Sequence, residues 1–245
     1  MKRRAGIDWA ALGRLAGLEF SPVGHGERLL SLLGGALSML ALFAAGHLYV
    51  EADALVPVVA SMGASAVLLF AVPHGPLSQP WPVLGGHVVS ALVGVVCAKL
   101  IGPPMLAAAL AVGLAIGAMH YLRCIHPPGG ATALVAVIGG PAVTGLGFQY
   151  VLTPVAANAL IVLAIAFLFN TPFPWRRYPA QLRSRAPGPA ATGDGGIRHE
   201  DFVYALSQLD TFVDVSEEDL LRIYALATGA RPAPVNPLRP GRASR

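Results

Sequence analysis

Charged residues are scarce in this sequence, and their scarcity excludes a soluble fold for most of the chain. Only 12% of the 245 residues are Asp, Glu, Lys or Arg, whereas soluble domains carry about 25%. Between residues 29 and 172 the charged side chains are Glu51, Asp53, Lys99 and Arg123. A soluble domain of that length needs far more polar surface. The stretch is therefore predicted to be an integral membrane domain.

Cysteine is also scarce, and catalytic motifs are missing. Cys97 and Cys124 both lie in or beside apolar segments, which argues against a structural disulfide. The sequence has no nucleophile elbow, phosphate loop, paired carboxylates or metal-ligand spacing. We therefore expect neither an enzyme nor a bound metal or cofactor. The formal charge of +4 comes mostly from the two ends, which favours the lipid bilayer over nucleic acid as a partner.

Six apolar segments follow one another in the membrane region, and we expect an all-α structure. Their approximate limits are 29–50, 55–72, 83–101, 105–122, 130–138 and 155–170. The fifth segment is too short to cross about 30 Å of hydrocarbon, which takes about 20 residues. The second segment is interrupted by Pro57 and by the small residues 61–65. Both segments are therefore expected to be broken or re-entrant half-helices.

These two irregular segments resemble each other at an offset of 67 residues. The triplet Gly-Ala-Ser at 63–65 aligns with Gly-Ala-Thr at 130–132. This indicates two repeats of three segments, 29–102 and 105–171, of which the second is inverted, because an odd number of crossings reverses the orientation. Inverted repeats with discontinuous helices are typical of transporters. The alternative is two small-residue packing faces, which membrane helices also favour.

The stretch 126–134 (His-Pro-Pro-Gly-Gly-Ala-Thr-Ala-Leu) predicts an abrupt helix start inside the membrane. Prolines are tolerated in a first helical turn and push the residue before them toward extended backbone. In the repeat arrangement one half-helix runs inward from Gly63 and its counterpart runs outward from Gly130. Their N-termini would then face each other near the midplane. Helix N-termini carry partial positive charge and can hold an anion.

The predicted site for a small monovalent anion combines backbone amides and hydroxyls and has no carboxylate. Its candidate residues are Ser61, Gly63, Ala64, Ser65, His126, Gly129, Gly130, Ala131 and Thr132. Candidates for lining or gating the pathway are Arg123, Asn158, His87 and His120. His126 either couples a proton to transport or fixes the re-entrant turn. Arg123 either attracts anions or anchors the chain at the membrane interface, and the remaining candidates are equally well explained by packing.

Outside the membrane domain (29–172) the sequence predicts four further regions. They are a cytoplasmic N-terminal segment (1–28), a basic linker (173–196), a helical hairpin (197–229) and a disordered tail (230–245). Basic residues flank both ends of the membrane domain, so we expect a multi-pass inner-membrane protein with both termini in the cytoplasm. The hairpin is too small to be stable alone. We expect it to dock on the membrane domain or on a second subunit, which favours a homodimer.

At the run 126–134 the sequence resembles the HPP family of integral membrane proteins, which is named for the His-Pro-Pro triplet. Further matching stretches are 60–70, 78–82 and 170–179, and the match covers about residues 25–180. The resemblance implies transport of nitrite or a related anion. Bacterial members often carry a C-terminal pair of CBS domains, which this chain lacks. An anion channel, or a membrane sensor or scaffold acting through the hairpin, is the alternative to a carrier.

Overall fold

The computed structural model describes residues 24–48 and 52–182, and within these ranges the chain is helical without any strand. The helices are α2 (His25–Gly46), α3 (Ala52–Ala71), α4 (Pro80–Leu100), α5 (Pro104–Tyr121), α6 (Pro127–Ile138), α7 (Pro141–Thr144) and α8 (Ala157–Asn170), with short turns η1 (Pro76–Ser78), η2 (Val151–Ala156) and η3 (Ala180–Leu182). Helices therefore occupy all six predicted apolar segments. The predicted hairpin and tail lie outside the described residues.

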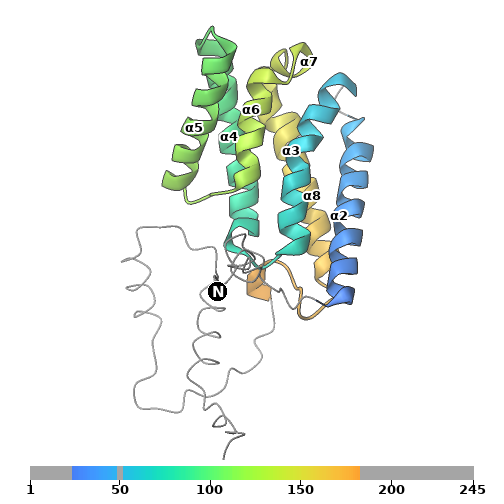
Figure 1. Ribbon diagram of the computed structural model, residues 1–245. Helices are drawn as coiled ribbons and strands as arrows, with labels where there is room; N and C mark the ends of the chain where they lie inside the picture. The colour runs from blue at the N-terminus through green and yellow to red at the C-terminus, as the bar shows by residue number, and fades with distance from the viewer. Residues whose placement is uncertain (1–23, 49–51, 183–245) are drawn as a thin grey trace, which may run out of the picture.

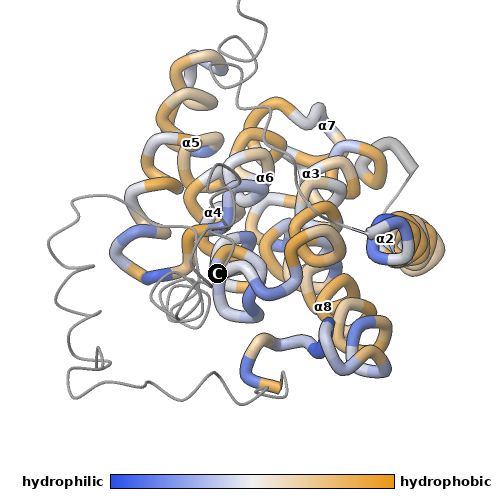
Figure 2. The backbone as a smooth tube through the Cα atoms, turned by 60° about the horizontal axis from the view of Figure 1, so that its bottom comes forward, coloured by the Kyte–Doolittle hydropathy of each residue, from blue (hydrophilic) through white to orange (hydrophobic). Residues whose placement is uncertain are grey.

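The surface of the helical bundle is apolar, as contact with lipid requires. Within the described residues four stretches are long and apolar enough to cross a membrane, namely α2, α4, α5 and Val151–Asn170, which is formed by η2 and α8 and is kinked at Thr153. Shorter apolar helices are Leu55–Ala71 in α3 and the whole of α6. Large side chains point outward, for example Met105 (88% exposed) and Leu40 (68% exposed). Figure 2 shows hydrophobic colour along most of each helix and hydrophilic colour at the first turn of α2.

The centre of the bundle is formed by α3, α4 and α6. α4 contacts α5, α6 and α8, whereas α3 contacts α2, α6 and α8. α5 and α2 lie at opposite edges (Figure 1). α2 begins and α8 ends at the same end of the bundle, which we call the terminal end (Figure 1). The other end carries α7 together with the α4–α5 turn, and we call it the α7 end.

The predicted break in the second apolar segment is wrong. α3 runs without interruption from Ala52 to Ala71 and contains Pro57. A proline ring disturbs the carbonyl four residues earlier, and here that carbonyl lies in the first turn of the helix, so the rest of α3 is unaffected. No half-helix starts at Gly63, whose amide lies within the helix. The expected pair of opposed helix N-termini is therefore absent from the described part of the chain.

The predicted short fifth helix corresponds to α6, although it begins three residues early, at Pro127. His126 is its N-cap and has extended backbone (φ −144°, ψ 101°), as expected for a residue that precedes proline. α6 ends at Ile138, as predicted. Its first turn lies well above the terminal ends of α3 and α4 (Figure 1). The chain between α5 and α6 therefore reaches into the depth of the bundle.

Glycines allow α6 and the chain before it to approach α4 closely. A Cβ atom at Gly86 would lie 2.5 Å from the Cβ of His126. A Cβ at Gly129 would lie 2.8 Å from the carbonyl oxygen of Gly86, and one at Gly94 would lie 2.6 Å from the carbonyl oxygen of Ala133. Side chains cannot be accommodated at these distances. The three glycines therefore determine how deeply His126 sits against α4.

A buried arginine joins three helices at the terminal end. Arg176, which follows α8, is 1% exposed and pairs with Glu27 in the first turn of α2. Its guanidinium also donates to the side-chain oxygen of Asn170 (3.0 Å) and to the carbonyl oxygen of Phe70 at the end of α3 (2.7 Å). The sequence analysis placed Arg176 in a basic linker. Its charge is instead neutralised inside the protein, where it holds α2, α3 and α8 together.

Candidate functional site

Four polar side chains form a hydrogen-bonded cluster in the interior, between α3, α4 and α6. They are Ser65 on α3, His87 on α4, His126 before α6 and Thr132 on α6, and each is 0% exposed. The Oγ atom of Ser65 lies 2.7 Å from Nε2 of His87 and 2.8 Å from Nε2 of His126. The Nδ1 atom of His87 lies 2.7 Å from Oγ1 of Thr132. We call these four residues the polar cluster.

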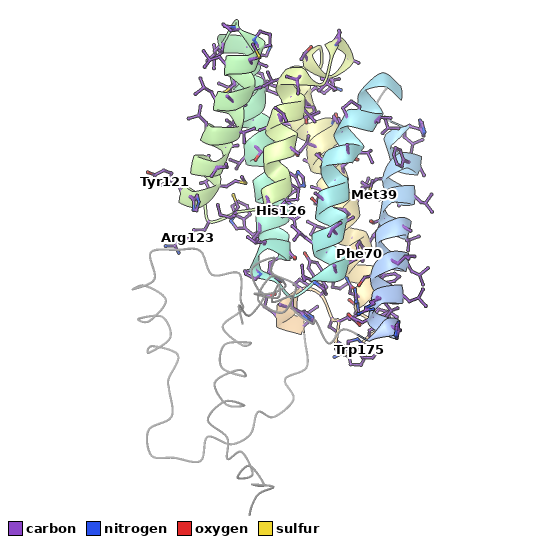
Figure 3. The ribbon with its side chains drawn as sticks, in the orientation of Figure 1. Met39, Phe70, Tyr121, Arg123, His126 and Trp175 are labelled. Carbon is purple, nitrogen blue, oxygen red and sulfur yellow. The ribbon has the colours of Figure 1, made fainter. Side chains whose placement is uncertain are left out.

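Backbone groups surround the polar cluster at both ends. The Nδ1 atom of His126 lies 2.9 Å from the carbonyl oxygen of Leu77 in η1, on the terminal side. Thr132 Oγ1 lies 3.4 Å from the carbonyl oxygen of Pro128, and the Thr132 carbonyl accepts a hydrogen bond from the hydroxyl of Tyr150 (3.0 Å). Figure 3 shows His126 inside the bundle, close to α4 and the first turn of α6. The cluster is therefore enclosed by α3, α4, α6 and η1, with backbone carbonyls as its further partners.

With both histidines neutral, the hydrogen bonds of the cluster can point in one direction only. The Leu77 carbonyl is an acceptor, so Nδ1 of His126 carries the hydrogen and Nε2 of His126 must accept. Ser65 therefore donates its hydrogen to His126 and accepts from Nε2–H of His87. Nδ1 of His87 is then an acceptor, and Thr132 donates to it. The two histidines consequently carry their hydrogens on different ring nitrogens.

Within the described residues, no charged side chain is bonded to the polar cluster. Arg176 is the only charged residue among the buried polar residues in the described part of the chain, and it pairs with Glu27 at the terminal end. Residues 24–48 and 52–182 contain no group of three or more His, Cys, Asp or Glu side chains that could hold a metal ion. The cluster is thus a set of neutral donors and acceptors. A carboxylate that would repel an anion is not among them.

The first turn of α6 does not supply the free backbone amides that the sequence analysis expected. Pro127 and Pro128 have no N–H, and the N–H of Gly129 donates to the carbonyl of His126 (2.8 Å). The next amide, at Gly130, is the first that a regular helix bonds internally. Prolines thus relieve the buried helix start of unsatisfied donors. The donors available to a ligand here belong to side chains.

The structure brings together three of the predicted anion-site residues, Ser65, His126 and Thr132, and adds the pathway candidate His87. The cluster as a whole was not predicted. Sequence reasoning also missed Tyr150, which anchors the Thr132 carbonyl. An aromatic residue with a hydroxyl beside an apolar segment was the available signal, because a buried Tyr hydroxyl usually finds a partner.

The other predicted residues lie elsewhere, in positions that their helices determine. Ser61 is buried in α3 and bonds the Val58 carbonyl (2.8 Å). Gly63 and Gly130 are partly buried, Gly129 packs on α4, and Ala64 and Ala131 are exposed on the outer surface. Among the pathway candidates, Asn158 is buried in α8, whereas His120 and Arg123 are exposed at the terminal end of α5; Figure 3 shows Arg123 at the edge of the bundle.

A cavity of about 290 Å³ lies at the α7 end, between α4, α5, α6 and α7. Its lining includes Lys99, Thr144 and Gly147 near the opening and the apolar Val95, Ala107 and Ala136. The Nζ atom of Lys99 lies 5.6 Å from the centre of the Phe148 ring, which is a cation–π distance. The polar cluster does not line this cavity. The cation of the cavity, Lys99, lies at the opposite end of the bundle from Leu77.

The fold and the buried cluster together define a class: a multi-pass helical membrane protein with a polar interior site. The family model described as "HPP, transmembrane region" matches residues 21–179, and the chain belongs to this family. Two transmembrane proteins of Dictyostelium discoideum are similar to it, one 44% identical over 123 residues and one 41% identical over 125 residues. Each match covers 49% of this chain but only 39% and 44% of the relatives. No solved structure matches.

Proposed function

We propose that the protein carries a small monovalent anion, nitrite foremost, across the membrane, and that the anion passes the polar cluster. Membership of the HPP family is consistent with a transport or channel role. The observation that carries the proposal is the cluster itself, since Ser65, His87, His126 and Thr132 are all 0% exposed inside an apolar bundle. Polar side chains are expensive in such an interior and usually mark a substrate pathway.

The chemistry of the cluster suits an anion. The Ser65 and Thr132 hydroxyls can rotate to donate to an oxygen atom, and each imidazole carries one N–H. Charge-assisted hydrogen bonds to an anion are stronger than those between neutral groups. The absence of a buried carboxylate from the described interior removes the main source of repulsion. Nitrite offers two oxygen atoms as acceptors for these hydroxyl and imidazole donors, whereas a cation would find no counter-charge.

Helix contacts support two related halves, as the sequence offset suggests. The first half would be α2, α3 and α4, and the second α5, α6 and α8. α2 contacts α3 as α5 contacts α6, α4 contacts α6 as α8 contacts α3, and α4 contacts α5 as α8 contacts α2. Among these six helices every contact between the halves thus has a counterpart, as a two-fold axis in the membrane plane would require. α3 and α6, which would be the equivalent central helices, carry Ser65 and Thr132.

A carrier is favoured over an open channel because the polar cluster is closed on both sides. Its four side chains have no exposed surface, while the cavity beside Lys99 ends before reaching them. A channel holds a continuous path, whereas a carrier passes through states in which its site is occluded. In this proposal the Lys99 cavity is the entrance from the α7 end, and η1 closes the site from the terminal end.

Uptake of nitrite, nitrate and chloride into liposomes holding only the purified protein tests this proposal. Protein-free liposomes are an essential control, because nitrous acid crosses bilayers unaided. Thr132→Val keeps the shape and removes the hydroxyl, and uptake should fall about tenfold or more, since hydrogen bonds to charged groups contribute about 1.5–3 kcal/mol. Thr171→Val, outside the cluster, is the matched control.

Two results would overturn the proposal. Absence of any anion flux from folded protein would remove the transport function, and full activity in Thr132→Val would remove the cluster from the pathway. Saturation of uptake and acceleration by anion on the far side would identify a carrier. Linear, unsaturated flux would identify a channel instead.

A further inference from the structure

We propose that the polar cluster binds one proton, shared between His87 and His126 and passed between them by the Ser65 hydroxyl, so that the anion is carried together with a proton. This inference rests on the proposed transport function and adds the coupling ion. It is carried by the two contacts of a single oxygen atom, since Ser65 Oγ lies 2.7 Å and 2.8 Å from the Nε2 atoms of the two histidines.

The neutral cluster can accept one further proton without losing a hydrogen bond. If the proton is added to His87, Nδ1–H donates to Thr132 and Nε2–H continues to donate to Ser65. The Thr132 hydroxyl then turns from His87 to the Pro128 carbonyl, which lies 3.4 Å away. Every other hydrogen bond keeps its direction. One hydroxyl rotation is therefore the only rearrangement that admits the proton.

The same extra proton can reside on His126 with all partners again satisfied. His126 then donates from Nδ1 to Leu77 and from Nε2 to Ser65. Ser65 donates to Nε2 of His87, whose Nδ1–H donates to Thr132. The two protonated states differ only in the positions of hydrogens along the line from His87 through Ser65 to His126. No heavy atom has to move.

Transfer between the two states is a balanced exchange of bonds. The Nε2–H bond of His87 breaks as its proton passes to Ser65 Oγ, and the original O–H bond of Ser65 breaks as that proton passes to Nε2 of His126. The excess charge moves from one ring to the other, and Ser65 regains a neutral hydroxyl. The ring centres are 4.9 Å apart, so one hydroxyl suffices to bridge them.

In the described part of the chain, the groups around the cluster provide no negative charge to balance this proton, so the transported anion is the expected counter-charge. Two titratable hydroxyls bond backbone beside the cluster, Tyr150 at the Thr132 carbonyl and Tyr178 at the Ser78 carbonyl in η1. The buried Cys124 precedes His126 by two residues. The other titratable groups of the packed helices lie at their C-terminal ends, Cys97 and Lys99 on α4 and His120 and Tyr121 on α5. The buried residues of α5 are alanines and a methionine, and α8 contributes Asn158 and Asn170. A lone charge in such an interior is costly, whereas an anion beside the protonated pair makes the site neutral overall. Anion and proton should therefore bind together.

Nitrogen-15 NMR of histidine-labelled protein in bilayers tests the shared proton without relying on transport. Above neutral pH His126 should carry its hydrogen on Nδ1 and His87 on Nε2. On acidification with nitrate present, the nitrogen-15 signals of both rings should shift in one titration step that corresponds to a single proton. In Ser65→Ala the two rings should titrate in separate steps. In Ser65→Thr, which restores the hydroxyl, they should again titrate together. The variants His87→Gln and His126→Gln assign the signals, and His47→Gln, at an exposed position, is the control.

Liposomes containing a pH-sensitive dye test the coupling. During nitrate or nitrite uptake, about one proton should enter the liposome with each anion. Uptake should be faster when the outside is acidic. In Ser65→Ala the proton flux that accompanies the anion should fall about tenfold or more, and Ser65→Thr should retain it. Anion uptake without protons, or two histidines that titrate independently in the unaltered protein, would overturn this inference alone. Absence of any anion flux would instead overturn the proposed function.

Discussion

Ser65 and Thr132 bind opposite nitrogen atoms of the same imidazole, that of His87. They lie 67 positions apart, which is also the offset that aligns the two irregular apolar segments. Equivalent residues of the two proposed halves therefore meet at one side chain. His87, which belongs to α4, thus connects α3 and α6 through its two ring nitrogens, and the hydrogen bond to either helix breaks if that helix moves away from α4.

Gly129 and Gly130 give a matched pair of substitutions with opposite expected results. A Cβ at Gly129 would meet the Ser90 hydroxyl and the Gly86 carbonyl at 2.7 and 2.8 Å, whereas one at Gly130 would meet only a Val112 methyl at 3.9 Å. Gly129→Ala should destabilise the protein by about 1–3 kcal/mol through overpacking. Gly130→Ala should be neutral or slightly stabilising. Thermal unfolding in detergent measures both, and equal melting temperatures would contradict the assigned packing.

Arg123 occupies a position that favours glycine. Its φ of 54° is left-handed, and the amides of Arg123 and Cys124 bond the carbonyls of His120 and Met119 to end α5. Arg123→Gly should therefore keep the fold and raise stability by up to about 1 kcal/mol. If the exposed guanidinium attracts anions, the same variant should lower uptake most strongly at low salt.

A second variant, Arg123→Asn, tests whether the loss of uptake comes from the missing charge. Asparagine also tolerates left-handed backbone and also lacks the charge. Both variants should show the same decrease in uptake at low salt. Unchanged uptake in both would assign Arg123 to the membrane interface, the alternative reading of its sequence position.

Arg176 should be among the least replaceable residues of the membrane domain. Arg176→Met would leave Glu27 unpaired and would remove donors from Asn170 and from the Phe70 carbonyl. Removing one partner of a fully buried ion pair typically costs about 3–5 kcal/mol. Glu27 is 30% exposed and also accepts a hydrogen bond from Trp175, so the loss should lie at or below the lower end of this range. Arg176→Lys should recover only part of this loss, because an ammonium cannot reach three acceptors in the directions that the guanidinium does. Chemical unfolding of the three proteins should give this order of stability.

Lys99 should act on the rate of anion capture rather than on the chemistry of the cluster. Lys99→Gln removes the cation of the cavity at the α7 end, and uptake at low anion concentration should fall about threefold to tenfold. Lys99→Arg should retain activity, because the charge and the contact with Phe148 persist. Raising the salt concentration should reduce the difference between Lys99→Gln and the unaltered protein. A deficit that is independent of salt would argue for a structural role.

The apolar runs of the sequence locate six helices, but they place three helix starts one to three residues late. Pro80, Pro104 and Pro127 open these helices in the structure, and the short helix that Pro141 opens was not predicted. The same residue type misled at Pro57, where proline sits early within a continuous helix. At Pro57 the carbonyl that the proline ring disturbs lies in the first turn of α3, so the helix continues.

The polar cluster was harder to predict because membrane helices are apolar all round and give no periodicity from which to choose a face. Ser61 and Ser65 lie one turn apart on the same side of α3, so spacing could not distinguish them. In the structure Ser61 bonds its own helix, while Ser65 meets two histidines. His87 was a candidate only as one of several apolar-segment histidines. Its role depends on Gly86 and Gly129, whose mutual contact is visible only in three dimensions.

The pairing of Glu27 with Arg176 also sets an order of assembly. Glu27 belongs to the first turn of α2, whereas Arg176 follows the last residue of α8, so a growing chain exposes the acid long before its partner is synthesised. α2 contacts α8 as well as α3. Among the described helices, α2 therefore remains incompletely secured until α8 has been inserted. Closure of the bundle in this sense follows the synthesis of Arg176, whose side chain enters between the ends of α2, α3 and α8.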